Sequence, residues 1–192
     1  DGYADVIVGA PGHTDGESGE GGMWVWHGSA DGLEDDWSKY AQGNRAGAAF
    51  GNSVSTAGDV NGDGYSDVIV GAPLHHLAPG PLEEGVVWVW HGSHDGLQDW
   101  SWRAKGQQLE ASLGQSVATA GDVNGDGFAD IIVGATRYTA GQDWEGAAFV
   151  WLGSLDGLNG GVYGNPANAH RHLQINQAAA RFGWSVSTAG DV

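Results

Sequence analysis

One short unit recurs three times along this 192-residue chain, and this repetition constrains the fold more than any other feature. The stretch DGYADVIVGAP at 1–11 returns almost unchanged at 63–73 and again at 126–136. Self-similarity at such a period indicates a repeat array, in which each unit needs its neighbours to bury its apolar face. We therefore expect one structural segment, 1–192, made of three repeats at approximately 1–62, 63–125 and 126–192.

Short apolar runs rich in Val, Ile and Trp fill each repeat, bounded by Gly, Pro, Asp and Asn. This pattern is typical of β-strands of about four to eight residues. Three strands are expected in each repeat, of the types DVIVGA, MWVWHG and FGNSVSTA, with a weaker fourth around 37–41 or 100–105. The 35 glycines and ten tryptophans also favour tight turns and packed flat side chains over long helices.

Alternation along the second strand places Trp24 and Trp26 on one face and Met23, Val25 and His27 on the other. Since both faces are largely apolar, we expect neighbours to cover the sheet on both sides. A repeated four-stranded sheet covered in this way is a β-propeller blade. The predicted fold is all-β, a β-propeller of four-stranded blades with three blade repeats per chain. A parallel β-solenoid is the main alternative, but solenoid coils are shorter than this unit.

Composition excludes several function classes. The formal charge of −17 repels nucleic acid and anionic membranes and attracts cations. The absence of cysteine rules out disulfides, thiolate metal sites and thiol nucleophiles. No apolar run approaches the roughly 18 residues that indicate a membrane span. We therefore expect neither nucleic-acid binding nor membrane insertion.

The repeat resembles the FG-GAP family, which forms the blades of the integrin α-subunit head and occurs in many bacterial surface proteins. FG stands at 50–51 and 182–183, and GAP at 9–11 and 71–73, while the second copy has Leu113-Gly114 and the third has Gly134-Ala135-Thr136. The resemblance spans essentially the whole chain. It implies a β-propeller scaffold for protein binding or adhesion that performs no chemistry, from an extracellular or cell-surface setting.

An acidic loop precedes the DVIVGA strand of the second repeat. Oxygen donors fall at its positions 1, 3, 5, 7 and 9, with Gly64 permitting the sharp bend. The donors are Asp59, Asn61, Asp63, the carbonyl of Tyr65, and Asp67. Five hard oxygen donors with several negative charges suit Ca²⁺ better than Mg²⁺, and position 12 is Val70 rather than the glutamate of an EF-hand. The resemblance implies the same ion in this hairpin.

The loop recurs before the third DVIVGA-type strand, as Asp122, Asn124, Asp126, the carbonyl of Phe128, and Asp130. A third, split site, weakened by the absence of its position 3, would combine Asp1, Tyr3 and Asp5 of one chain with Asp191 of the next. The alternative is an Asn/Asp/Gly-rich turn with no metal.

Histidines and tryptophans suggest other functions. No catalytic motif accompanies the eight histidines, so we expect no enzyme and no catalytic residue. His27 and His91 are predicted to be structural, and His75, His76, His170 and His172 to be exposed loop residues. In-strand tryptophans (24, 26, 88, 90 and 151) are predicted core, whereas Trp37, Trp100, Trp102, Trp144 and Trp184 are candidates for a binding surface. A glycan-binding propeller, or part of a larger extracellular enzyme, remains the alternative.

The two ends of the chain fall inside the same motif, which predicts an open arc. We expect the first blade to be completed by a strand of the 180–192 type from another chain, giving a homo-oligomer. A dimer with six blades is favoured because propellers usually have about four to eight blades. The competing view is a fragment of a longer propeller.

Overall fold

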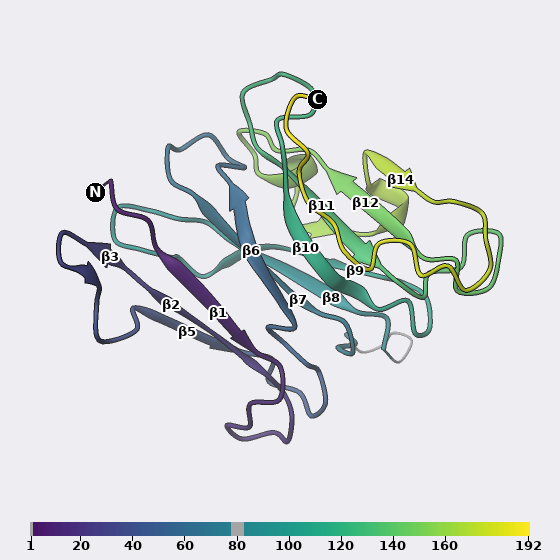
Figure 1. The fold of residues 1–192 in the computed structure, drawn as a ribbon, viewed down its shortest axis with the longest axis horizontal. Helices are drawn as coiled ribbons and strands as arrows, with labels where there is room; N and C mark the ends of the chain where they lie inside the picture. Colours follow the sequence, from purple (N-terminus) through teal and green to yellow (C-terminus); the bar gives the residue numbers. More distant parts are fainter. Residues whose placement is uncertain (1, 78–82) are drawn as a thin grey trace.

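The chain is all-β in its computed structural model, which describes residues 2–77 and 83–192 (Figure 1). The first sheet has the order β1 (Val6–Ala10), β2 (Gly22–Trp26), β5 (Lys39–Gln42). The second has the order β13 (Tyr163–Gly164), β9 (Trp100–Lys105), β8 (Val86–Trp90), β7 (Asp67–Ala72), β6 (Ser53–Gly58). The third has the order β10 (Leu113–Gly121), β11 (Asp130–Ala135), β12 (Ala147–Trp151), β14 (Arg171–Leu173).

The remaining elements are small. A two-stranded hairpin joins β3 (Gly28–Ser29) to β4 (Gly32–Leu33), and two single-turn 3₁₀ helices lie at Leu158–Gly160 and Pro166–Asn168. The Ser29 hydroxyl donates to the Gly32 carbonyl, which closes this GSxDGL turn as a structural hairpin. None of the helices found in the described part of the chain has the length and apolarity needed to cross a membrane.

Each complete sheet takes its inner strand from the repeat before it. Strand β6 closes the first repeat but pairs antiparallel with β7 of the second, with Val54 opposite Val70 and Thr56 opposite Val68. In the same way β10 pairs with β11. The weaker fourth strand predicted around 37–41 and 100–105 is confirmed as β5 and β9. This exchange ties consecutive sheets together along the sequence.

The FGNSVSTA-type strand predicted for the third repeat does not form, and that prediction is wrong for this copy. Residues 183–192 contain no strand, although 185–190 repeat the sequence of β6. The pairing just described differs for this segment: β6 and β10 are each held by the first strand of the following repeat, whereas residues 185–190 pair with no strand within the described residues. Without a partner strand, the backbone there gains no ladder of hydrogen bonds.

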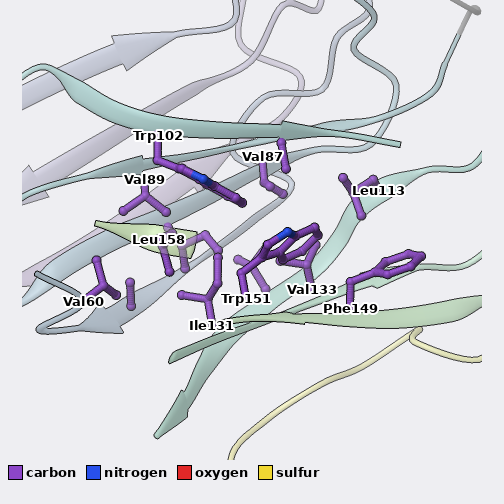
Figure 2. Packing of buried hydrophobic residues seen from close by; sticks show 14 of the residues in the cluster. Val60, Val87, Val89, Trp102, Leu113, Ile131, Val133, Phe149, Trp151 and Leu158 are labelled. Carbon is purple, nitrogen blue, oxygen red and sulfur yellow. The ribbon is translucent and has the colours of Figure 1, made fainter. Parts of the chain in front are cut away.

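Two apolar layers lie between the sheets. One packs Met23 and Val25 of the first sheet, with Phe50, against Trp88 and Trp90 of the second. The other packs the opposite face of the second sheet against the third (Figure 2), and its buried residues include Val87, Val89, Trp102, Phe149 and Trp151. Successive sheets therefore stack face to face, which is the packing of a propeller-type fold.

Neighbouring sheets were expected to cover both faces of each sheet. This is confirmed for the second sheet but not for the first. All five residues of β8 are buried, whereas Trp24 and Trp26 on β2 are only half-buried. The difference arises because the tryptophan face of β8 packs on the first sheet, and within the described residues no sheet packs on the equivalent face of β2. Trp24 instead contacts the rings of His13 and Tyr40.

The FG and GAP glycines meet each other, which explains why both are glycine. A methyl group added at Gly71, in GAP of the second repeat, would collide with the carbonyl oxygen of Gly114. Equivalent collisions occur between Gly9 and Gly51 and between Gly134 and Gly183. The glycine pairs therefore permit a close backbone approach at the point where the chain leaves one sheet and enters the next.

The long connection of the third repeat at 159–177 folds onto the two neighbouring sheets. Strand β14 supplies the fourth strand of the third sheet, with Phe149 opposite His172. Strand β13 pairs parallel with β9, so it covers the outer edge of the second sheet. The Arg103 guanidinium lies between the rings of Trp100 and Tyr163, at 5.1 and 5.2 Å from their centroids, which adds cation–π contacts to this joint.

Candidate metal centre

The acidic loop between β6 and β7 is closed by its own side chains. The Asp59 carboxylate accepts three backbone N–H groups, from Gly62 at 2.6 Å, Asp63 at 3.1 Å and Gly64 at 2.9 Å. The Asn61 amide donates to Asp63 Oδ2 at 2.9 Å, and Asp63 Oδ1 accepts the Tyr65 N–H. Gly64 has φ +91°, a conformation that glycine adopts without strain. The side chains at positions 1, 3 and 5 therefore curl into one network.

Asp67, at position 9, lies beneath this loop and is fully buried. Its Oδ2 accepts the Val60 N–H at 2.8 Å and its Oδ1 accepts the Gly92 N–H at 2.9 Å. Burial raises its pKa to about 6, a rise that the two backbone hydrogen bonds and nearby His91 oppose and the Asp63 carboxylate supports. Asp67 thus joins the loop to the turn after β8 in addition to any role as a ligand.

The loop between β10 and β11 repeats this network bond for bond. Asp122 accepts from Gly125, Asp126 and Gly127, and the Asn124 amide donates to Asp126 at 2.8 Å. Phe128 donates to Asp126 Oδ1. The pKa of Asp122 is lowered, chiefly by the hydrogen bond from the Gly127 N–H.

Asp130 takes the place of Asp67 beneath the second loop. It is buried and accepts the N–H groups of Val123 at 2.8 Å and Gly153 at 2.9 Å. Burial raises its pKa, as the neighbouring carboxylates of Asp126 and Asp122 also do, while the two backbone donors oppose the rise.

The donor chemistry of both loops fits a hard cation. The side chains that converge carry carboxylate and amide oxygens, and a carboxylate has about four lone-pair sites, more than these N–H groups use. Oxygen donors with this charge suit Ca²⁺. However, no three His, Asp or Glu side chains within residues 2–77 and 83–192 are arranged so that they could hold a metal ion. The loops therefore carry the types of oxygen donor that Ca²⁺ prefers, but the described residues form no cage of three acidic groups.

The residues of the predicted split site belong to separate segments of the single chain, so the site between two chains stays a prediction. Asp5 accepts the Gly28 N–H at 2.9 Å and lies 3.2 Å from His27 Nδ1. Asp191 is an exposed residue of the segment 183–192, which forms no strand. Tyr3 is half-exposed, and Asp1 lies outside the described residues.

His75 corrects the prediction that the loop histidines are exposed. It is 6% exposed and its ring meets Trp88 edge-on, 5.1 Å between centroids. Burial, assisted by the Arg45 guanidinium, lowers its pKa to about 4. His13 packs on Trp24 and Tyr138 on Phe149 in the same edge-on manner. Comparing the residue two places after GAP in each repeat shows an aromatic ring every time.

The other histidines differ among themselves. His76 is half-buried beside Arg45, whereas His170 and His172 are exposed as predicted, although the His172 ring stacks on Phe149 at 4.8 Å. His27 contacts Asp5, and His91 Nδ1 lies 3.3 Å from the Asn61 amide nitrogen. His91 therefore lies beside the acidic loop at 59–67, and His27 lies beside Asp5.

The tryptophans proposed for a binding surface are exposed with one exception. Trp37, Trp100, Trp144 and Trp184 are between 41% and 58% exposed. Trp102 is only 1% exposed and contacts Trp151 at 5.4 Å, so its assignment to a binding surface is wrong. Trp100 and Trp102 are two residues apart and would share a face in a regular strand, but the register with β8 is irregular between them, with Trp102 opposite Val89 and Trp100 opposite Trp90.

Three buried glutamates were missed by the sequence reasoning. Glu20, Glu84 and Glu145 precede equivalent glycines in the three repeats and are at most 1% exposed. Glu20 accepts the N–H groups of Asp15 and Glu17, and Glu84 accepts those of Leu77 and Gln107. Their role is to satisfy backbone donors of the connecting loops. The signal was the recurrence of Glu-Gly before each MWVW-type strand.

Comparison with known proteins identifies the repeat. The FG-GAP repeat model matches residues 50–90 and 113–151, which correspond to each other strand for strand. Integrin alpha pat-2 of Caenorhabditis briggsae is 43% identical over 97 residues, 46% of this chain and 7% of that protein. Integrin alpha-PS5 of Drosophila melanogaster is 34% identical over 148 residues, 70% of this chain and 14% of that protein. Integrin alpha-6 of Homo sapiens is 29% identical over 136 residues, which cover 70% of this chain and 11% of that protein. The chain thus spans a small part of these relatives.

Proposed function

This chain is an FG-GAP repeat protein, and from that premise we propose that it is a calcium-stabilised, integrin-like propeller scaffold for protein binding or adhesion. Its three sheets are then three blades, two of them with their inner strand in place. The scaffold acts outside the cell or at its surface, binds partners through its loops and faces, and performs no chemistry. A second copy of the chain completes the ring.

The calcium proposal rests mainly on one observation: the two acidic loops have the same hydrogen-bond network. Two separate stretches of chain place carboxylate and amide oxygens at positions 1, 3 and 5 in the same hydrogen-bond network. Asp59, Asn61, Asp63, the Tyr65 carbonyl and Asp67 would hold one ion, and Asp122, Asn124, Asp126, the Phe128 carbonyl and Asp130 the other. When bound, the ion neutralises the crowded carboxylates and stiffens the hairpin between the inner strands.

Calorimetric titration of the chelator-treated protein with CaCl₂ tests this proposal. We expect two ions per chain for the wild type and one for Asp63→Asn or Asp126→Asn, because each substitution removes a charged donor from one loop. Asp31→Asn is the matched control, since it removes the same charge from an exposed turn and should leave two ions bound. No calcium binding by the wild type would overturn the proposal, as would equal stoichiometry in all four proteins.

Glycan binding is a second candidate because of the aromatic rings exposed on the first sheet. Trp37, Tyr40 and Trp24 form a chain of ring contacts with centroid distances of 6.0 and 5.0 Å. Such a row could stack on sugar rings. A glycan array compared between the wild type and Trp37→Ala tests it, and binding that is equal in both would exclude this surface.

A further inference from the structure

A cavity lies between the first and second sheets, at their outer strands β5 and β9. Its volume is about 420 Å³, and its walls come from residues 39–50 and 88–100, in the interior of the sequence. A pocket of this size can enclose a small ligand or a large side chain. We propose that this cavity binds an aromatic side chain, best a tryptophan, carried by an extended basic segment of a partner protein. The inference rests on the proposed binding scaffold, for which it names a surface and a partner class, but not on calcium.

The next pair of sheets shows what fills the equivalent space. On the first sheet Lys39 lies opposite Val25. On the second sheet Trp102 lies opposite Val89, the counterpart of Val25. Lys39 and Trp102 therefore occupy the same position in successive sheets. Trp102 is buried, and its ring lies 5.4 Å from that of Trp151 (Figure 2), so an indole fills the space that is open beside Lys39.

The surface opposite Lys39 matches the surface that receives Trp102. Trp90 ends β8 as Trp151 ends β12, and each packs toward the sheet of the preceding repeat. The other aromatic residues that line the cavity are Tyr40, Phe50, Trp88 and Trp100. An aromatic ring that enters beside Lys39 would therefore meet Trp90 edge-on, as Trp102 meets Trp151, and would gain both burial and ring contacts.

The cavity is open because the second repeat has a short connection. In the third repeat, residues 159–170 separate the DGL turn from β14 and include β13, which pairs with the edge of β9. This strand covers Trp102, since a methyl group added at Gly164 would collide with the indole. In the second repeat only residues 98–99 separate DGL from β9, and no strand pairs with the outer edge of β5 in the part of the chain that the structure describes. An extended segment can therefore reach the cavity along this edge.

An ion pair between the two sheets lies at the mouth of the cavity. The Lys39 ammonium is 3.5 Å from the carboxylate of Asp99, whose side chain is fully exposed. Exposed pairs of this kind stabilise a fold little, so an entering ring displaces the pair at low cost. The released ammonium can then lie against the bound ring as a cation–π partner, as the Arg103 guanidinium does with Trp100.

The charges around the mouth favour a basic partner. Asp99 lines the cavity and is exposed. A run of exposed acidic residues also lies a short distance before β5, at Glu34, Asp35 and Asp36. The chain as a whole carries a formal charge of −17. A tryptophan flanked by Lys or Arg is therefore attracted to this cavity, whereas one flanked by Asp or Glu is repelled.

Calorimetric titration with the peptide acetyl-Lys-Gly-Trp-Gly-Lys-amide tests the proposal. We expect one peptide bound per chain, and affinities about tenfold or more lower when leucine replaces the tryptophan or when glutamate replaces both lysines. Binding should be the same in calcium and in chelator. A wild type that binds calcium but not this peptide overturns the present inference alone, so its failure is distinct from failure of the calcium scaffold.

Lys39→Trp fills the cavity from within and should abolish peptide binding, while urea unfolding shows a stability at least equal to that of the wild type. Lys105→Trp is the matched control, because it makes the same substitution on β9 outside the cavity, and it should bind as the wild type does. Trp100→Ala removes one wall without filling the space and should weaken binding about tenfold. Unchanged affinity in both Lys39→Trp and Trp100→Ala would overturn the proposal, as would binding of methyl glucoside in place of the peptide, which would assign the cavity to a glycan.

Discussion

At the scale of single residues, buried polar side chains connect the strands of this fold. Asp67 and Asp130 each join an acidic loop to the turn that follows the next strand, and the three buried glutamates satisfy loop N–H groups in each repeat. These groups are buried because backbone donors between closely packed sheets must be paired away from water. Their recurrence at equivalent positions makes them part of the repeat itself.

His75 should make the protein sensitive to mild acid. Its folded-state pKa is about 4, below the ordinary value of 6.5, so the unfolded chain takes up the proton first as the pH falls. The contribution of neutral His75 is therefore complete above about pH 6.5 and is lost between there and pH 4, by about 3 kcal/mol. His75→Tyr, the residue type of Tyr138 in the third repeat, should remove this loss.

Urea unfolding of wild type and His75→Tyr at pH 7 and pH 4, in chelator, measures the difference. The exposed His94→Tyr serves as the control and should follow the wild type. If the wild type and His75→Tyr lose the same stability over this range, His75 is not held neutral by burial.

At the scale of elements, the sequence predicts the strands better than their partners. The β9 bounds, Trp100–Lys105, could be read from the apolar pattern. The failure of 185–190 to form a strand could not, because that segment has the sequence of β6 and differs only in its surroundings. Strand β13 was also missed, since two residues carry no periodicity and gain their structure from the edge of β9.

At the candidate site too, the sequence predicted the residue types and their spacing but not the burial and contacts of the side chains. The composition and spacing of the acidic loops were readable from sequence, and the structure adds that Asp67 and Asp130 each accept two backbone N–H groups. Burial of His75 was missed, because a single histidine in a long connection has the pattern of an exposed loop residue, and only comparison of the three repeats shows the shared aromatic ring at this position. Trp102 was misassigned because its side of β9 depends on the register with β8.

The glycine pairs between consecutive sheets predict a sharp penalty for one methyl group. Gly71→Ala would press its Cβ against the Gly114 carbonyl, so the two sheets must shift apart. We expect the free energy of unfolding to fall by about 1–3 kcal/mol or more, the usual cost of overpacking. Gly12→Ala is the control, because nothing lies within 4 Å of an added Cβ there. Denaturant unfolding of both variants checks this, and equal stability would mean that the approach is not tight.

At the scale of the whole molecule, the chain is an acidic arc of three sheets with one incomplete inner edge. The net charge of −17 opposes compactness and favours cation binding, and six of the 24 acidic residues lie at 59–67 and 122–130. Calcium would therefore act on the whole molecule by relieving repulsion at the hairpins that carry the inner strands. The proposed ring closure acts at the remaining edge.

Thermal unfolding with and without calcium tests the calcium-stabilised scaffold most directly. Each site should contribute about 2.7 kcal/mol when calcium is at roughly a hundred times its dissociation constant, and two sites should raise the melting temperature by about 10 °C or more. The rise should be present in the wild type and in Asp31→Asn and absent in the double variant Asp63→Asn, Asp126→Asn, at one fixed protein concentration. A wild-type melting temperature that is the same in calcium and in EDTA would contradict the account.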